Sequence, residues 1–347
     1  VNSLGYHYPG YDEALKDQID KLMHISNLYY NEPIIEAGAK LVKASKMSKA
    51  FFTNSGTEAI EGALKAAKKY AYVRDGHADH EIIAMNHSFH GRSIGALSVT
   101  GTAHYREPFE PLMGGVKFAD FNDLESVKAQ ITDKTCAIIT EVVQGEGGIY
   151  PAKKEFLEGL RQICDEKDIM LIFDEIQCGM GRTGHYFAWQ AYGVQPDIMT
   201  SAKALGCGVP VGAFVLGEKA AKASLEPGDH GTTYGGNPFV CAAVSKVFDI
   251  YENDKIIEHV QEMTPYLEQK LDEIVAKHEC AATRRGMGFM QGIVIQGRPV
   301  GEVVKAALAK GLLVISAGSD VLRIVPPLVI TKEHIDKMAA ILDECME

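Results

Sequence analysis

The stretch Ile169–Asp174 reads IMLIFD, an unbroken apolar run that ends in a carboxylate. A run that is apolar at every position, rather than at alternate ones, is typical of a strand buried on both faces. The stretch before it, Lys153–Lys167, is amphipathic and predicts a helix. A helix followed by a buried strand is the repeating unit of a parallel sheet covered by helices, so this region predicts an α/β fold.

The same alternation extends along the chain on both sides of this unit. Short runs rich in β-branched residues predict further strands at Ala50–Thr53, Glu81–Met85, Cys136–Val143, Asp197–Thr200 and Val211–Leu216. Apolar residues at helical spacing predict helices over Asp12–Leu28, from Pro33 onward, and over Glu58–Tyr70. The first two thirds of the chain therefore predict one helix-covered sheet.

After about Ser245 the pattern changes to long amphipathic helices and short strands. The helices are predicted at Lys246–Tyr251, Ile256–Lys277, Val300–Lys310 and Thr331–Cys345, and the strands at Phe289–Ile295, Leu312–Ile315 and Val321–Ile324. This pattern predicts a smaller α+β domain. No Pro-rich linker separates the two parts, so we expect a continuous helix near residues 236–253 to join them.

Composition excludes several classes of protein. The chain has 347 residues, 46% hydrophobic and 23% charged, which excludes disorder and collagen. A net charge of -11 argues against nucleic acid or a membrane surface as a partner. The scattered cysteines, without a C-x-x-C pair, favour a reduced, cytoplasmic protein, and no apolar run is long enough for a membrane helix. Because the chain begins at Val1, we expect an N-terminal segment to be missing.

Gly179–Gly184 forms a literal G-x-G-x-x-G after a strand, with Asp197 downstream, as in dinucleotide-binding proteins. Its context argues against that interpretation. The preceding strand ends in Asp174 and Glu175, and an aromatic stretch at 186–189 follows where a small-residue helix is needed. We therefore expect a glycine-rich loop with unusual backbone angles.

Asn54–Ala59 reads NSGTEA and lies where a predicted strand turns into a helix. The free N–H groups of a helix start, together with the hydroxyls of Ser55 and Thr57, would bind a phosphate. The alternative is an ordinary helix N-cap followed by a glutamate. This motif alone does not decide between the two.

Two charged residues at strand ends favour phosphate binding over an ordinary N-cap at residues 54–59. Asp174 ends a buried strand, where a carboxylate is costly unless it meets a cation such as a pyridinium nitrogen. Lys203 follows the strand near 197–202 and enters a glycine-rich loop, where desolvation would make it a candidate Schiff-base former. A phosphate-binding helix start, an aspartate and a lysine in this order predict a pyridoxal 5'-phosphate site.

Several strings resemble the class III aminotransferases, pyridoxal-phosphate enzymes of fold type I. They read FDEIQ at 173–177, TSAKALG at 200–206 and HGTTYGGNP at 230–238, in the order of the family. The resemblance implies a large domain at 14–245, with a mostly parallel, mixed seven-stranded sheet covered by helices. A smaller α+β domain would follow at 246–347, and residues 1–13 would be the remnant of a segment near the substrate entrance.

The resemblance also implies roles at the cofactor. Lys203 would form the Schiff base and then move the proton, and Asp174 would keep the pyridine nitrogen protonated. Gln177 would hydrogen-bond the ring hydroxyl. Phe89, in the string SFHGR at 88–92, would stack on the ring, with His90 beside it.

The cofactor phosphate is implied to lie between two subunits. Ser55, Gly56 and Thr57 of one subunit would bind it together with Thr233 of the other, and Thr232 lies next to Thr233 in the sequence. The resemblance therefore implies an obligatory homodimer with shared active sites.

Three charged residues are implied to bind substrate carboxylates. Arg92 would bind the carboxylate far from the reacting amine in both half-reactions. Arg323 would bind the α-carboxylate of glutamate only, and Glu146, in EVVQGEGG at 141–148, would pair with Arg323 otherwise. The alternative for all three is an ordinary surface ion pair. Tyr8 lies in a segment that would approach the substrate.

Within the family, GRTG at 181–184 and AGSDVLR at 317–323 are most similar to members that act on N2-acetylornithine. The implied reaction moves the δ-amino group of N2-acetyl-L-ornithine to 2-oxoglutarate, in arginine biosynthesis. Succinylornithine, ornithine and 4-aminobutyrate remain alternative donors, because the residues named above do not distinguish them. A non-catalytic pyridoxal-phosphate-binding module would need an attached basic DNA-binding segment, which this acidic sequence does not contain. No metal site is predicted.

Overall fold

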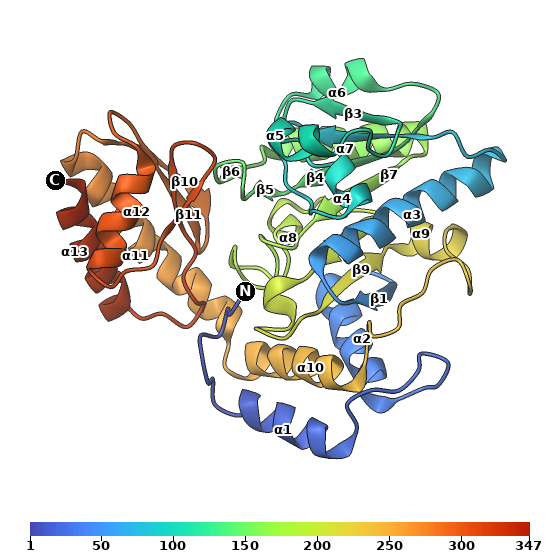
Figure 1. Ribbon diagram of the computed structural model, residues 1–347, viewed down its shortest axis with the longest axis horizontal. Coiled ribbons are helices and arrows are strands. Elements are labelled where there is room, and N and C mark those ends of the chain that lie inside the picture. Colours follow the sequence, from blue (N-terminus) through green and yellow to red (C-terminus); the bar gives the residue numbers. More distant parts are fainter.

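The computed structural model describes residues 1–347 and contains a large sheet and a smaller one, each with its own helices (Figure 1). The α-helices are α1 (Tyr11–Lys21), α2 (Glu32–Ser45), α3 (Gly56–Asp75), α4 (Ile94–Ser98), α5 (Ala103–Arg106), α6 (Leu124–Gln130), α7 (Lys154–Lys167), α8 (Trp189–Tyr192), α9 (Glu218–Ala223), α10 (Pro238–Asn253), α11 (Ile256–Lys277), α12 (Val300–Ala309) and α13 (Lys332–Met346). Two 3₁₀ turns are η1 (Glu107–Phe109) and η2 (Lys203–Leu205). None of these helices is long and apolar enough to cross a membrane.

The strands of the large sheet are β1 (Lys49–Thr53), β2 (Glu81–Met85), β3 (Val116–Ala119), β4 (Thr135–Glu141), β7 (Met170–Asp174), β8 (Ile198–Ser201) and β9 (Gly212–Leu216). Their order is β1-β9-β8-β7-β4-β2-β3. All neighbours are parallel except β9, which is antiparallel to both β1 and β8. The prediction of a mostly parallel, mixed seven-stranded sheet is confirmed.

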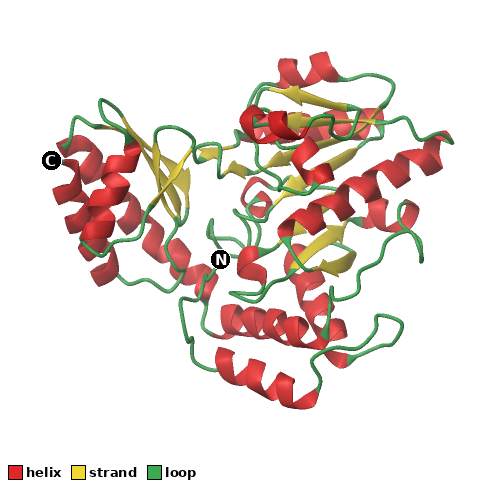
Figure 2. Cartoon of the chain, viewed as in Figure 1, coloured by secondary structure: helices red, strands yellow, loops and turns green.

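The large sheet is buried on both faces, as its continuous apolar runs predict. Ile82, Ala84 and Ile139 pack with Ile60 and Ala63 of α3 on one face. Ile83, Met85 and Ile138 belong to the core on the opposite face, which also holds Leu157 and Leu160 of α7. Figure 2 shows helices on both sides of these strands. Successive side chains of one strand thus enter two different cores.

The smaller sheet is antiparallel, with the order β10-β11-β13-β12. Its strands are β10 (Ala281–Met287), β11 (Met290–Ile295), β12 (Ile315–Ala317) and β13 (Val321–Ile324), and α11, α12 and α13 accompany it. A two-stranded piece, β5 (Val143–Gln144) with β6 (Tyr150–Pro151), lies between the two parts of the molecule (Figure 1). The connecting helix predicted near 236–253 is α10, which begins after Asn237, whose side chain caps it.

The prediction of a helix over Asp12–Leu28 is wrong beyond Lys21. The backbone of Leu22 is extended, and Ile19, Leu22 and Met23, which carried the helical periodicity, are all exposed. The strand predicted at Leu312–Ile315 lies later, at β12, and β3 and β10 were not predicted. β10 contains Thr283, Arg284 and Arg285 and is not apolar, because it is an edge strand whose side chains are largely accessible.

Candidate functional site

A cavity of about 520 Å³ lies at the carboxyl ends of β4, β7 and β8, next to the start of α3. In this structure Glu141 of β4 pairs with Asp174 of β7, and Asp174 pairs with Thr200 of β8. Ligands of open α/β sheets bind outside the carboxyl ends of the strands. The predicted site residues that line the cavity are Ser55, Gly56, Thr57, Phe89, His90, Arg92, Asp174, Gln177 and Lys203.

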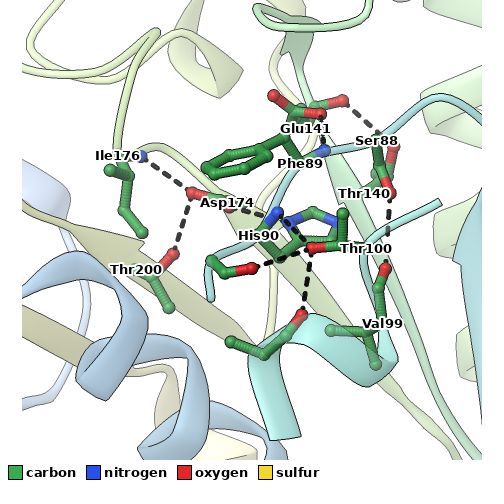
Figure 3. Close-up of polar contacts among 12 residues, drawn as sticks. Ser88, Phe89, His90, Val99, Thr100, Thr140, Glu141, Asp174, Ile176 and Thr200 are labelled. Carbon is green, nitrogen blue, oxygen red and sulfur yellow. Dashed lines mark hydrogen bonds and ion pairs between the residues drawn. The ribbon is translucent and has the colours of Figure 1, made fainter. Parts of the chain in front are cut away.

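Asp174 is buried and held by three hydrogen bonds (Figure 3). Oδ1 accepts from the backbone N–H of Ile176 at 3.0 Å and from the Thr200 hydroxyl at 3.2 Å. Oδ2 lies 2.7 Å from Nδ1 of buried His90, whose Nε2 has no partner. Since a carboxylate only accepts, Nδ1 of His90 is the donor in this pair. The three bonds fix the carboxylate at the wall of the cavity.

Lys203 begins the 3₁₀ turn directly after β8, with a positive φ of 48°. This strained conformation, sparsely populated by residues other than glycine, turns the chain at the cavity. Burial lowers the pKa of the ammonium, while Asp174, Glu146 and Glu141 partly offset that effect. A neutral lysine amine, which is the nucleophilic form, is thereby favoured.

The start of α3 matches both interpretations of Asn54–Ala59. Ser55 is an ordinary N-cap, because its hydroxyl accepts from the N–H of Glu58 at 3.3 Å. Thr57 exchanges hydrogen bonds with Ser93, at 2.8 Å between the hydroxyls. The helix start nevertheless opens into the cavity, so its first N–H groups and its dipole face the space where an anion would lie.

Arg92 lies at the cavity beside two aromatic rings. Its guanidinium carbon is 4.0 Å from the centroid of the Tyr105 ring and 5.4 Å from that of Phe89. Phe89 and Tyr105 pack edge to face, with their centroids 5.9 Å apart. Cation–π contact thus holds Arg92 without a carboxylate partner, and its hydrogen-bond donors remain available for one.

Arg323 and Glu146, which are far apart in the sequence, form an ion pair. Nη1 of Arg323 lies 2.5 Å from Oε1 of Glu146 and donates to Oε1 of Gln177 at 2.9 Å. Nε2 of Gln177 donates to the same Glu146 oxygen at 3.3 Å. Arg323 is buried, and its Nε has no partner. This pair is not the solvent-exposed one of the alternative interpretation.

Other predicted residues lie away from this cavity. The Tyr8 hydroxyl donates to Asp254 at 2.9 Å, and Tyr8 does not line the cavity. Thr232 and Thr233 line a second cavity of about 850 Å³, together with Leu28, Tyr29 and other residues. Within one chain, therefore, the two threonines are not brought to the cavity of Lys203.

Sequence reasoning missed Glu141, Tyr105 and Val1, of which Glu141 and Val1 line the cavity. Glu141 carries the same signal as Asp174, a carboxylate at the end of an apolar strand, and could have been found by it. Tyr105 and Val1 carry no sequence signal, because only the folded chain brings them to the site.

The G-x-G-x-x-G segment, residues 179–184, is a loop of the large part that forms hydrogen bonds with the smaller part. Met180, Gly181 and Gly184 have positive φ, as predicted for a glycine-rich loop. Arg182 is buried and donates to the Phe289 carbonyl at 3.2 Å, and the Phe289 N–H donates back to the Arg182 carbonyl at 2.8 Å.

Asp75, His77 and His80 lie close enough together to hold a metal ion. The Arg74 guanidinium already occupies both oxygens of Asp75, each at 2.6 Å. The rings of His77 and His80 stack at 16°, and stacked rings direct their in-plane lone pairs past one another. We assign no metal to this cluster.

Comparison with known proteins places these features in context. A family model for class III aminotransferases matches residues 1–346. An acetylornithine aminotransferase of Methanocaldococcus jannaschii is 47% identical over 99% of this chain and 86% of its own length. A succinylornithine transaminase of Yersinia pseudotuberculosis is 44% identical over 96% of this chain and 83% of its own length.

Solved structures agree with the fold. An ornithine aminotransferase of Toxoplasma gondii, whose active site holds pyridoxal 5'-phosphate at partial occupancy, is 28% identical, with a TM-score of 0.94. The match covers 99% of this chain and 83% of that one.

Proposed function

We propose that this chain, which belongs to the class III aminotransferases, moves the δ-amino group of N2-acetyl-L-ornithine to 2-oxoglutarate. The products are N-acetyl-L-glutamate 5-semialdehyde and L-glutamate, and the step belongs to arginine biosynthesis. The observation that carries the proposal is the Arg323–Glu146 pair, both of whose members bond to Gln177 at the wall of the Lys203 cavity. A site with a removable partner for its arginine can accept substrates with and without a carboxylate next to the reacting amine.

The cofactor of this family is pyridoxal 5'-phosphate, and the cavity fits it. Buried Asp174 has no lysine or arginine partner and faces the cavity, where a protonated ring nitrogen would supply the missing cation. Gly56, at the start of α3, lines the cavity, and a Cβ there would lie 3.0 Å from Cδ1 of Ile176, another lining residue. When bound, the cofactor withdraws electrons from the carbon attached to the substrate nitrogen.

Lys203 and Asp174 would then serve that chemistry in different ways. Lys203 Nζ, favoured in its neutral form by burial, would take a proton from the reacting carbon of the substrate and later give it back. Asp174, held by His90 and Thr200, would keep the ring nitrogen protonated. Phe89 and Gln177, which line the same cavity, would hold the ring through a stacking contact and a hydrogen bond.

The arginines would divide the recognition of the substrates. Arg92 binds the distant carboxylate of both, with its guanidinium oriented by Tyr105. Arg323 stays with Glu146 while N2-acetylornithine is bound and releases it when the α-carboxylate of glutamate arrives. The switch favours the terminal amine because it withholds the cation that an α-amino substrate would need.

The enzyme is proposed to act as a homodimer. Leu28, Tyr29, Tyr30 and Ile35 are exposed and lie on one segment of the chain, and a contiguous apolar surface of this kind marks an interface. Exposed Thr233 lies at the cavity beside that segment, where it could reach the phosphate of a partner subunit. All seven cysteines are free thiols, which suits a reducing cytoplasm.

Succinylornithine is the second candidate donor, because a transaminase for it is nearly as similar to this chain as the acetylornithine enzymes are. Ornithine is the third, through a structure of lower identity. A non-catalytic binding module would have no use for the Arg323–Glu146 pair.

A side-by-side steady-state assay tests the proposal. N2-acetylornithine, succinylornithine, ornithine and 4-aminobutyrate are each offered with 2-oxoglutarate, and kcat/KM is compared. We expect the highest value for N2-acetylornithine. A higher value for any other donor would reassign the substrate, and no turnover with all four would overturn the proposed reaction.

A further inference from the structure

Glu141 is a buried carboxyl group to which the proposed mechanism gives no task. It ends β4, pairs in register with Asp174 of β7 and is only 4% exposed. No lysine or arginine forms an ion pair with it, although it lines the cavity of Lys203. A buried acid without a cation is costly, so its hydrogen bonds must account for its position.

Those hydrogen bonds join two separate loops. Oε2 of Glu141 accepts from the backbone N–H of Phe89 at 3.3 Å, and Oε1 accepts from that of Gly145 at 3.1 Å (Figure 3 shows the first contact). Phe89 carries the ring that lines the cavity, and Gly145 precedes the switch carboxylate Glu146. One side chain therefore fixes both walls of the site relative to the sheet.

The Gly145 end of this clamp continues into the switch. A Cβ at Gly145 would lie 2.4 Å from Cδ of Gln177, so the bare backbone packs directly against that amide. Gln177 in turn bonds to both Glu146 and Arg323. The position of the 145–148 loop thus decides whether Glu146 can reach Arg323.

The titratable groups that face Glu141 lie on β7, on the 88–92 segment and on the loop after β7. Asp174 of β7 disfavours its ionised form, His90 of the 88–92 segment favours it, and the Cys178 thiol lies on the loop after β7. Burial is the largest effect and raises the pKa of Glu141 to about 7. Glu141 in turn acts on Lys203 by raising the pKa of its ammonium.

We propose that Glu141 is a positioning residue that clamps the Phe89 segment and the 145–148 loop to the end of β4, setting the cavity wall and the Arg323–Glu146 switch together. The inference rests on the proposed function for the roles of Phe89 and Glu146. The clamp itself rests on the two backbone hydrogen bonds.

The chain offers a matched control in Glu175. It too is buried and has a pKa raised by burial to about 7. Its oxygens also accept two backbone N–H groups, those of Ala188 and Trp189, each at 2.8 Å. These bonds anchor the start of α8 rather than the site loops. Glu175→Gln therefore removes an equivalent charge without touching the clamp.

The direct test is hydrogen exchange of the holoenzyme, measured by mass spectrometry. In Glu141→Gln one oxygen becomes an NH₂ group, which cannot accept from either amide. We expect exchange about tenfold faster in the peptides that cover 86–92 or 143–149, as for the loss of one hydrogen bond. Glu175→Gln should speed exchange around residues 186–190 only. Unchanged exchange in both site peptides of Glu141→Gln would overturn the clamp.

Two further measurements separate a positioning role from a merely structural one. Removing the Glu141 charge should move the pH midpoint of the visible absorption of the holoenzyme downward, by about half a unit, because a nearby anion favours the protonated base. The ratio of kcat/KM for N2-acetylornithine to that for glutamate should fall about tenfold as the switch loosens. Glu175→Gln should leave both values unchanged.

The outcomes separate failure of the Glu141 clamp from failure of the proposed reaction. If the wild type transaminates and both variants share its midpoint and ratio, the inference fails while the proposed function stands. If the wild type turns over no donor, the proposed function fails, yet exchange and absorption still report on the clamp. Should Glu141→Gln not fold, Glu141→Asp keeps the charge but cannot span both amides, and the same faster exchange is expected.

Discussion

At the scale of single residues, Lys203 is set apart from the other lysines by burial. Many lysines of the chain pair with carboxylates at the surface, as Lys219 does with Asp168 at 2.8 Å. Lys203 forms no such pair, lines the cavity and has a lowered pKa. These properties favour the neutral, nucleophilic form of its amine over that of a surface lysine.

Reduction of the holoenzyme with borohydride, followed by peptide mapping, should therefore label Lys203. Lys203→Ala should abolish both the label and the visible absorption, because Lys203 is the only lysine whose side chain lines the cavity. Lys219→Ala serves as the control and should keep both. A label on Lys219 or Lys65 would contradict the assignment.

Arg323 and Arg92 should differ in which half-reaction they serve. Arg323→Ala should slow the glutamate half-reaction roughly ten- to a hundredfold, as for the loss of a charge-assisted hydrogen bond, and affect N2-acetylornithine much less. Arg92→Ala should slow both half-reactions. Single-turnover rates of the two half-reactions measure this difference.

Glu146→Ala completes the comparison, because it leaves Arg323 without its partner. Glutamate should then bind more tightly, and discrimination against α-amino substrates should fall. Equal losses in both half-reactions for Arg323→Ala would show that Arg323 is not the switch.

At the scale of elements, the packing of α3 on the sheet depends on residue 62 being a glycine. A Cβ at Gly62 would lie 2.2 Å from Cε1 of Phe214 in β9, whereas a Cβ at Gly301 in α12 would meet nothing within 4 Å. Alanine has the higher helix propensity at either position, so only the packing separates the two sites.

Gly62→Ala should accordingly lower the free energy of unfolding by about 1–3 kcal/mol, the usual cost of overpacking a core. Gly301→Ala should raise it by up to about 1 kcal/mol. Urea denaturation of both variants measures the difference. Stabilisation by Gly62→Ala would mean that α3 can move away from β9 at little cost.

At the scale of the whole molecule, the exposed aromatic segment beside Thr233 predicts a partner subunit. Tyr30 is 95% exposed, so Tyr30→Asp should not disturb the fold of one chain. It should split the dimer and abolish activity together, because Thr233 then reaches no second site. Leu313→Asp, at an 82% exposed position of the smaller part, is the control and should change neither.

Sedimentation velocity and turnover, measured at one protein concentration, decide this prediction. A fully active monomer, in either the wild type or Tyr30→Asp, would contradict the shared site.

The sequence by itself determined the alternation of elements. Because residues 169–174 are apolar at every position, they must be buried on both faces, and β7 and its neighbours lie where their apolar runs begin and end. Asp174 and Lys203 could be chosen from the sequence for the same reason. A charged residue at the end of a buried strand is costly unless it meets a partner or serves a function. The helix predicted over 12–28 failed beyond Lys21, because periodicity records spacing and cannot tell which side is solvent.

Only the tertiary structure decided what meets at the site. The pairing of Arg323 with Glu146 joins β13 of the smaller sheet to the loop between β5 and β6, and no local pattern fixes their distance. Tyr105 of α5 contacts Arg92, and Glu141 of β4 contacts Phe89 and Gly145, and these three partners lie in loops with no periodic pattern. The physical reason is that local sequence sets the backbone conformation and burial of each element, whereas contacts between distant residues depend on how the elements pack.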